Sequence, residues 1–153
     1  MIPAILLFVI LIVLDQAAKY LAVIHLLPVD SITLIPGILN LTYVENRGAA
    51  FGLFQGGRWF FVIITVIIMA GIIWYYIKLP KSKYHNLLRF TLVLIASGAV
   101  GNFIDRFRNG YVVDYLQAAF INFPVFNIAD SCVVVGTILF AILLLFENRF
   151  THE

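Results

Sequence analysis

The fold is decided by the stretch Trp59–Ile77, WFFVIITVIIMAGIIWYYI, which carries no charged residue over its whole length. A helix needs about 20 apolar residues to cross the roughly 30 Å hydrocarbon core of a bilayer. Aromatic residues lie at both ends of the stretch, as is typical of the two interfaces between a membrane and water. The stretch therefore predicts a membrane-spanning helix.

The rest of the chain has the same character. Of its 153 residues, 63% are hydrophobic and 12% are charged, and the mean hydropathy is +1.03. Soluble domains are about half apolar, so we expect one all-α integral membrane domain over residues 1–153. The apolar runs predict four transmembrane helices at about residues 2–27, 59–77, 87–107 and 126–146, with outer loops at 28–58 and 108–125.

The first outer loop is expected to form a small β-sheet on the outer, extracytoplasmic side of the membrane. Its segment SITLIPGILNLTYVENRGAAFGLF mixes β-branched and aromatic residues with turn signals at Pro36-Gly37 and at Asn46-Arg47-Gly48. The side is predicted from charge. The short connection between the second and third helices contains Lys78, Lys81 and Lys83 and no acid, so it should face the cytoplasm, with both termini.

Several classes of function are disfavoured. The net charge of +2, without a basic run, argues against a nucleic-acid partner. One cysteine, Cys132, and three scattered histidines form no recognisable ligand set, so we expect neither a metal site nor a cofactor. Ser97 lies in IASGA, which is not the G-x-S-x-G pattern of a nucleophile elbow.

Polar residues from three helices fall at one depth. At 1.5 Å per residue, Asp15, Asn102 and Asp130 lie about 20, 22 and 24 Å from the inner ends of their helices. Ionisable side chains inside a bilayer usually face the bundle interior, where they pair or serve function. We therefore expect a functional site in the outer third of the membrane.

Plainer explanations stay open for each of these groups. Asp15 and Lys19, spaced i and i+4, could simply neutralise each other. Asn127 and Asp130 could be a helix cap and a first-turn acid.

The same applies to the remaining acids, since Asp105 and Arg106 could form a local salt bridge and Asp114 could be a solvated loop residue. The alternative is that the outer loop brings Asp114 to Asp130. Two carboxylates held close together share a proton, so one can accept a proton from water while the other donates to a carbonyl oxygen.

Five motifs carry a specific resemblance: LDQAAK (14–19), ENRGAAF (45–51), GNFIDR (101–106), VVDY (112–115) and FNIAD (126–130). With these motifs in this order, the chain resembles lipoprotein signal peptidase, the bacterial signal peptidase II. Arg47 and Tyr115 stand where many members of that family have threonine and phenylalanine. The resemblance implies a membrane aspartic endopeptidase that cuts prolipoproteins before a diacylglyceryl-modified cysteine.

The resemblance also implies roles for individual residues. Asp114 and Asp130 would be the catalytic pair. The residues that bind substrate or orient the pair would be Asn46, Asn102, Arg106 and Asn127, and the residues that support the site would be Asp15, Lys19, Asp105 and Gly48.

The partners implied are the diacylglyceryl-prolipoprotein substrate and membrane lipids, with the chain a monomer in the bacterial cytoplasmic membrane and its site at the outer face. Two other functions stay open. A small proton-coupled transporter also uses buried acids, although transporters tend to bind near the midplane. A non-catalytic membrane subunit would use the polar residues for assembly alone.

Overall fold

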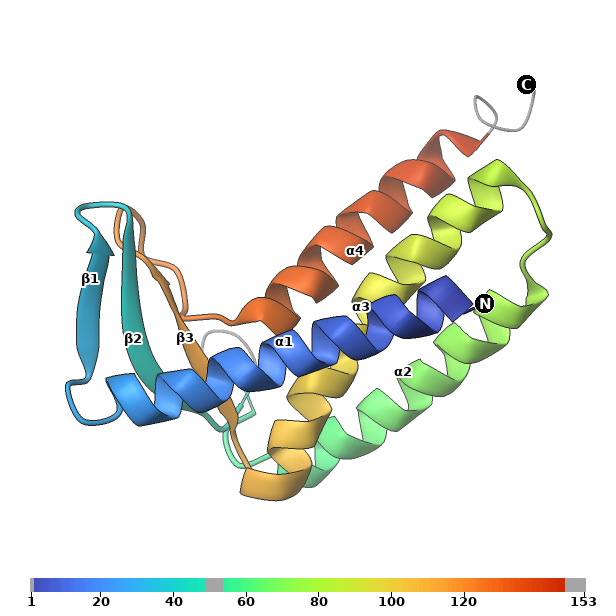
Figure 1. The fold of residues 1–153 in the computed structure, drawn as a ribbon. Coiled ribbons are helices and arrows are strands. Elements are labelled where there is room, and N and C mark those ends of the chain that lie inside the picture. The colour runs from blue at the N-terminus through green and yellow to red at the C-terminus, as the bar shows by residue number, and fades with distance from the viewer. Residues whose placement is uncertain (1, 49–53, 148–153) are drawn as a thin grey trace.

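The computed structural model describes residues 2–48 and 54–147. Over these residues the chain forms four apolar helices and a small antiparallel sheet, which confirms the predicted architecture (Figure 1). All four helices are long and apolar enough to cross a membrane. In chain order the elements are α1 (Ile2–Leu26), β1 (Ser31–Ile35), β2 (Leu39–Asn46), α2 (Arg58–Lys78), α3 (Lys83–Asn109), β3 (Val112–Ala118) and α4 (Ile128–Leu145).

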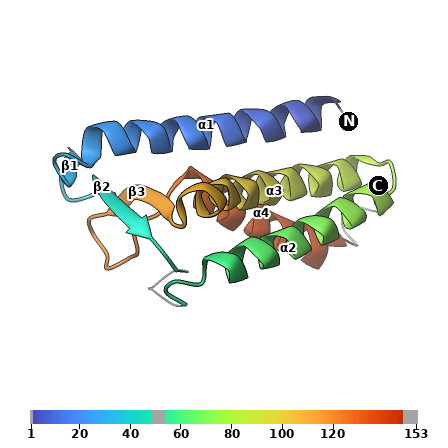
Figure 2. The same ribbon diagram turned by 90° about the horizontal axis from the view of Figure 1, so that it is seen from below.

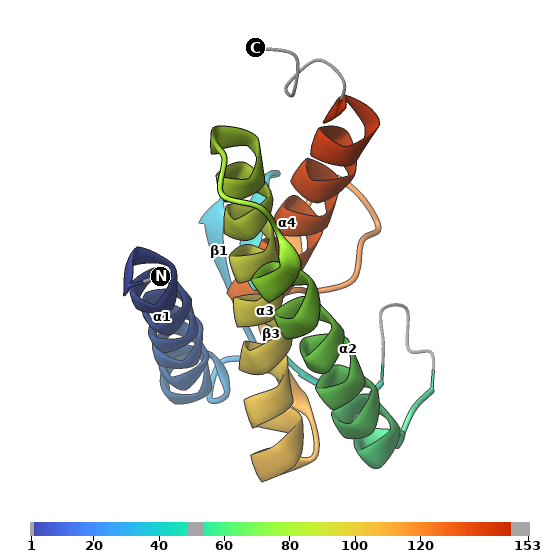
Figure 3. The same ribbon diagram turned by 90° about the vertical axis from the view of Figure 1, so that its right-hand side faces the viewer.

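Helix α3 is the centre of the bundle, with α1, α2 and α4 around it (Figures 2 and 3). In α3, half of the most apolar 18-residue segment is buried. In the other three helices the buried share of the corresponding segment is only 6–11%. Glycines allow α4 to pack closely on α3. A Cβ atom at Gly98 would overlap the Ala129 carbonyl oxygen, and one at Gly136 would lie 2.9 Å from Ile95 Cγ1.

The ends of α3 are set by local signals. The helix begins at Lys83, because the Ser82 side chain accepts a hydrogen bond from the His85 N–H at 3.2 Å and so caps the first turn. It ends at Asn109, because the next residue, Gly110, has a φ of 85°, a left-handed conformation that glycine adopts without strain. The chain reverses there and enters β3 two residues later.

The sheet has the order β1-β2-β3, and its third strand comes from the second outer loop. The sequence predicts a loop over residues 108–125, but Val112–Ala118 pairs antiparallel with β2, with Asn46 opposite Val112 and Val44 opposite Asp114. Asp114 is therefore held by a ladder of backbone hydrogen bonds in a strand. No flexible segment is needed to deliver it.

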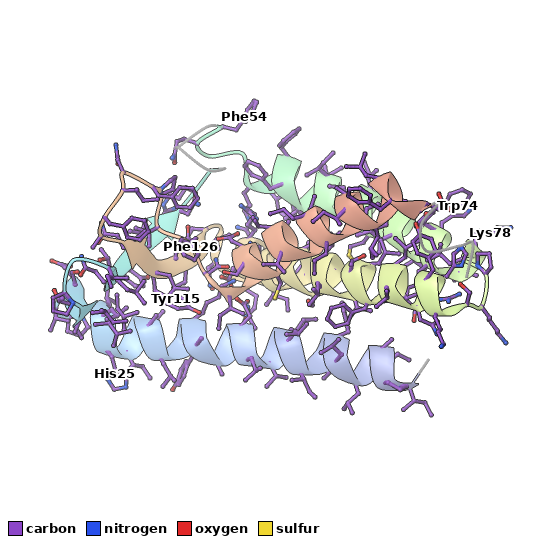
Figure 4. The ribbon with its side chains drawn as sticks, turned by 90° about the horizontal axis from the view of Figure 1, so that it is seen from above. His25, Phe54, Trp74, Lys78, Tyr115 and Phe126 are labelled. Carbon is purple, nitrogen blue, oxygen red and sulfur yellow. The ribbon has the colours of Figure 1, made fainter. Side chains whose placement is uncertain are left out.

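The two ends of the bundle differ in character. His25 and Phe126 lie near the sheet, whereas Trp74 and Lys78 lie at the opposite end (Figure 4). The lysine-rich connection between α2 and α3 and the sheet are therefore on opposite sides of any membrane that the helices span.

Candidate active site

Asp114 lies in the middle of β3 and is only 1% exposed. Both of its carboxylate oxygens accept hydrogen bonds from asparagine side chains. Asn46 Nδ2, at the end of β2, donates to Oδ2 at 2.9 Å, and Asn127 Nδ2 donates to Oδ1 at 2.7 Å. Asp114 is thus a buried acid with two fixed donors.

Asp130 lies in the first turn of α4, where it forms a capping box with Asn127. The Asp130 N–H donates to Asn127 Oδ1 at 2.8 Å, and the Asn127 N–H donates to Asp130 Oδ2 at 3.2 Å. Asn102 Nδ2 from α3 donates to the other oxygen, Oδ1, at 2.7 Å. The helix cap considered for Asn127 and Asp130 is present, and the same cap turns Asp130 towards Asn102.

All four oxygens of Asp114 and Asp130 therefore have a donor, and three donors are asparagine amides. The orientation of each amide is fixed because its oxygen accepts from a group that can only donate, a backbone N–H or an ammonium group. The acceptor–donor pairs are Asn46 Oδ1 with Gly48 N at 3.0 Å, Asn127 Oδ1 with Asp130 N at 2.8 Å, and Asn102 Oδ1 with Lys19 Nζ at 2.9 Å. The NH2 groups must then face the two carboxylates.

Lys19 is the centre of a buried charge cluster next to these asparagines and carboxylates. Its Nζ lies 2.9 Å from Asp15 Oδ2 and 3.0 Å from Asp105 Oδ2. The expected pairing of Asp15 with Lys19 is present, and Lys19 also forms an ion pair with Asp105 of α3. Among the described residues no ion pair joins Asp105 to Arg106, so the local salt bridge considered above is not formed.

The two acids of this cluster hold the residues that precede the candidate catalytic pair. Asp15 Oδ1 accepts from the Ala129 N–H at 2.9 Å, so a side chain of α1 caps the start of α4. Asp105 Oδ2 accepts from the Val113 N–H at 3.2 Å at the start of β3. Ala129 and Val113 are the neighbours of Asp130 and Asp114, so Asp15 and Asp105 hold the backbone next to both acids.

Arg106 and Gly48 lie on the side of the site towards α2. Arg106 donates from Nη2 to the Gly48 carbonyl oxygen at 3.2 Å, and its guanidinium lies 4.7 Å from the centre of the Phe61 ring. Gly48 is buried and follows the Asn46 turn. The last three residues of the ENRGAAF motif, 49–51, fall outside the described residues.

Gln16 is a site residue that our sequence reasoning missed. Its Nε2 lies 3.0 Å from Asp105 Oδ1, 3.2 Å from the Gly101 carbonyl oxygen and 3.2 Å from Asp15 Oδ2. It therefore links α1 to α3 beside the charge cluster. The signal was its place in the LDQAAK motif, next to Asp15, but an uncharged side chain did not stand out.

The surroundings of Asp114 raise the pKa of its carboxyl group. Burial raises the pKa of Asp114 from 3.8 to about 7, and the nearby charge of Asp130 acts in the same direction. The hydrogen bonds from Asn46 and Asn127 favour the ionised form and oppose the shift. A pKa near 7 suits a group that both accepts and donates protons at neutral pH.

Comparison with known proteins gives a consistent picture. The family model described as signal peptidase (SPase) II matches residues 7–146. A lipoprotein signal peptidase from Caldanaerobacter subterraneus subsp. tengcongensis is 48% identical over 136 residues, which cover 88% of this chain and 90% of that protein. The one from Symbiobacterium thermophilum is 45% identical over 151 residues, or 97% of this chain and 98% of that protein.

Two solved structures are also similar, both of them bacterial membrane enzymes obtained by the in meso method. The one at 2.3 Å resolution has a TM-score of 0.86 and 36% identity, and covers 99% of this chain and 92% of its own. The one at 1.9 Å resolution has a TM-score of 0.85 and 39% identity, with 95% and 94% covered.

Proposed function

The chain belongs to the signal peptidase II family, and from this premise we propose that Asp114 and Asp130 act as an aspartic dyad that cleaves prolipoproteins. The family makes the chain a multi-pass bacterial membrane peptidase that removes signal peptides. The observation that carries the mechanism is the donor arrangement, in which fixed amide and backbone N–H groups hold all four carboxylate oxygens.

The proposed reaction is hydrolysis by water. One carboxylate accepts a proton as the water oxygen attacks the scissile carbonyl carbon, and the other carboxyl group gives its proton to the carbonyl oxygen. The tetrahedral intermediate then collapses as the C–N bond breaks and a proton passes to the leaving nitrogen. The products are the carboxyl end of the signal peptide and the free amine of the cysteine. The titration belongs to the pair, so no fixed acid or base is assigned.

We propose a substrate whose cysteine already carries diacylglyceryl. A signal peptide is itself a short apolar helix, and its cleavage point comes at the outer membrane surface. The dyad lies where α3 and α4 meet the sheet, at the end of the bundle away from the lysine-rich connection. A site at that level can reach the peptide bond while the lipid tails stay in the bilayer.

The supporting side chains have distinct roles in this proposal. Asn46, Asn102 and Asn127 orient the dyad through the hydrogen bonds described above. The Arg106 guanidinium, which is tied to Gly48, is the cation available to hold a backbone carbonyl of the substrate. Asp15, Lys19 and Asp105 keep the start of α4 and the start of β3 in place.

The test uses purified protein in lipid with a diacylated precursor peptide. Asp114→Asn and Asp130→Asn should each lower kcat by roughly 100-fold or more, since general acid–base catalysis contributes about 10² to 10⁴. Asp30→Asn is the matched control. Asp30 lies in the exposed turn before β1 with a φ of 62°, which asparagine tolerates, so this variant should keep full activity. Retained cleavage by either dyad variant would rule out the mechanism.

A further inference from the structure

One end of the sheet exposes a group of large apolar side chains. They belong to the end of β1, to the turn between β1 and β2 and to the loop that follows β3, and each is between 45% and 67% exposed. We call this group the sheet-tip patch. Its members are Leu34, Ile35, Ile38, Phe120, Ile121 and Phe123.

The backbone brings the two segments of the sheet-tip patch together. Ile35 is paired with Leu39, and Leu39 with Ala118. The end of β1, the start of β2 and the end of β3 therefore lie in one row. The Ala119 N–H donates to the Ile38 carbonyl oxygen at 2.9 Å, which ties the loop to the turn. The sheet-tip patch is therefore one surface, although its segments are some 80 residues apart in the chain.

The composition around the sheet-tip patch is unlike that of a surface in water. Neither residues 31–44 nor residues 115–129 contain a single charged residue or histidine. Strand β1 is an edge strand and all five of its residues are exposed. Proteins in water protect such edges with lysine, proline or a covering element, because a bare apolar edge pairs with other chains.

We propose that the sheet-tip patch docks on the lipid bilayer, with its phenylalanines among the headgroups of the outer leaflet. The strands run across the end of the helical bundle, so that the tip projects sideways past the start of α4 (Figure 1). A tip that projects sideways from the bundle faces the membrane that the helices cross. Exposed apolar patches mark membrane or partner contacts, and aromatic side chains favour the interface. The proposal does not depend on the proposed peptidase mechanism.

The experiment measures depth in the bilayer directly. In a Cys132→Ser background, single cysteines replace Phe120, Ile121 or, as the control in the exposed α2–α3 connection, Lys81. Each is labelled with an environment-sensitive fluorophore and placed, one copy per disc, in nanodiscs of phosphatidylcholine and phosphatidylglycerol. Quenching is then measured with aqueous iodide and with lipids that carry a nitroxide in the headgroup region.

Labels at 120 and 121 should be quenched by the nitroxide lipids on the order of threefold more strongly than the label at 81, and less by iodide, because they lie within the interface. Equal iodide quenching at all three positions, without lipid quenching, would overturn the proposal. Shielding from iodide without lipid quenching would also overturn it and would indicate a protein contact. Substrate is absent, so failure here leaves the cleavage test unaffected.

Discussion

At the scale of single residues, the site is organised by the polarity of three asparagine amides. Each amide oxygen is held by a donor, so each NH2 group is turned to Asp114 or Asp130. For Asn102 that donor is Lys19, which also forms ion pairs with Asp15 and Asp105. Lys19 is therefore expected to act on Asp130 through the orientation of Asn102, in addition to its role in stability.

This role can be separated from charge balance. Lys19→Met leaves two buried acids without a counterion and should lower both the melting temperature and the activity. The double variant Lys19→Met/Asp105→Asn keeps the net charge of the cluster and should regain much of the melting temperature. Its kcat should stay at least about tenfold low, because a hydrogen bond to a charged group contributes about 1.5–3 kcal/mol. A double variant with wild-type kcat would refute the role in orientation.

A second prediction at this scale follows from the raised pKa of Asp114. The folded protein binds the Asp114 proton more tightly than the unfolded chain does, since the pKa rises from 3.8 to about 7 on folding. The free energy of unfolding should therefore fall as the pH rises from about 4 to about 7, by at most about 4 kcal/mol. The melting temperature of Asp114→Asn should lack this part of the pH dependence, which scanning fluorimetry in detergent can measure. Parallel profiles for the two proteins would contradict the shift.

The residues of the site are easier to predict from the sequence than their contacts. Charged and amide side chains in apolar helices are conspicuous, so the helical rise alone places Asp15, Asn102 and Asp130 at one depth. The connection from Lys19 to Asp105, and from Asp15 to the Ala129 N–H, could not be predicted. Such contacts depend on the rotation of each helix about its axis, which residue spacing along one helix does not fix relative to its neighbours.

At the scale of elements, the α3–α4 contact positions Asp130, one member of the proposed dyad. A hydrogen bond of 2.7 Å from Asn102 Nδ2 to Asp130 Oδ1 joins these two helices. Gly98 lies one helical turn before Asn102 in α3. A Cβ atom at Gly98 would collide with the Ala129 carbonyl oxygen and lie 2.8 Å from Val133 Cγ2. The two helices can keep this separation only with glycine at position 98.

Gly98→Ala should therefore destabilise the protein by about 1–3 kcal/mol, as overpacking does, and should reduce cleavage because α4 carries Asp130 away from Asn102. Gly71→Ala is the matched control. Gly71 lies in α2, and a Cβ atom added there would meet nothing within 4 Å, so alanine should be neutral or slightly stabilising. Thermal unfolding and cleavage rates of the two variants decide the matter, and equal behaviour would contradict the packing argument.

The strand β3 shows the limit of predicting elements from local sequence. VVDYLQA has the β-branched and aromatic residues of a strand, but it follows a helix and precedes an apolar stretch, a position that favours a loop. Its strand character depends on pairing with β2, some 70 residues earlier in the chain. Propensity over seven residues cannot decide this, because strand formation is governed by partners as much as by composition.

At the scale of the whole molecule, the orientation in the membrane remains a prediction. Basic residues in the connection between α2 and α3 favour the cytoplasmic side, with the sheet outside. In a Cys132→Ser background, a cysteine at the exposed position Lys81 should react with an impermeant maleimide only after the cells are permeabilised. A cysteine at the exposed position Glu45 in β2 should react in intact spheroplasts. The reverse pattern would invert the proposed site to the inner face.

The capping of α4 by a side chain of α1 has a consequence for biosynthesis. Asp15 is made more than 100 residues before its partner Ala129, the amide donor Asn127 and Asp130, the second member of the proposed dyad. A nascent chain that has inserted only three helices lacks Asp130 and so lacks the complete proposed dyad, and the Asp15 carboxylate in its first helix does not yet have the Ala129 N–H as its partner. With the proposed dyad, proteolytic activity arises only once α4 has been made, and a product that lacks α4 cannot cut the precursors that surround it.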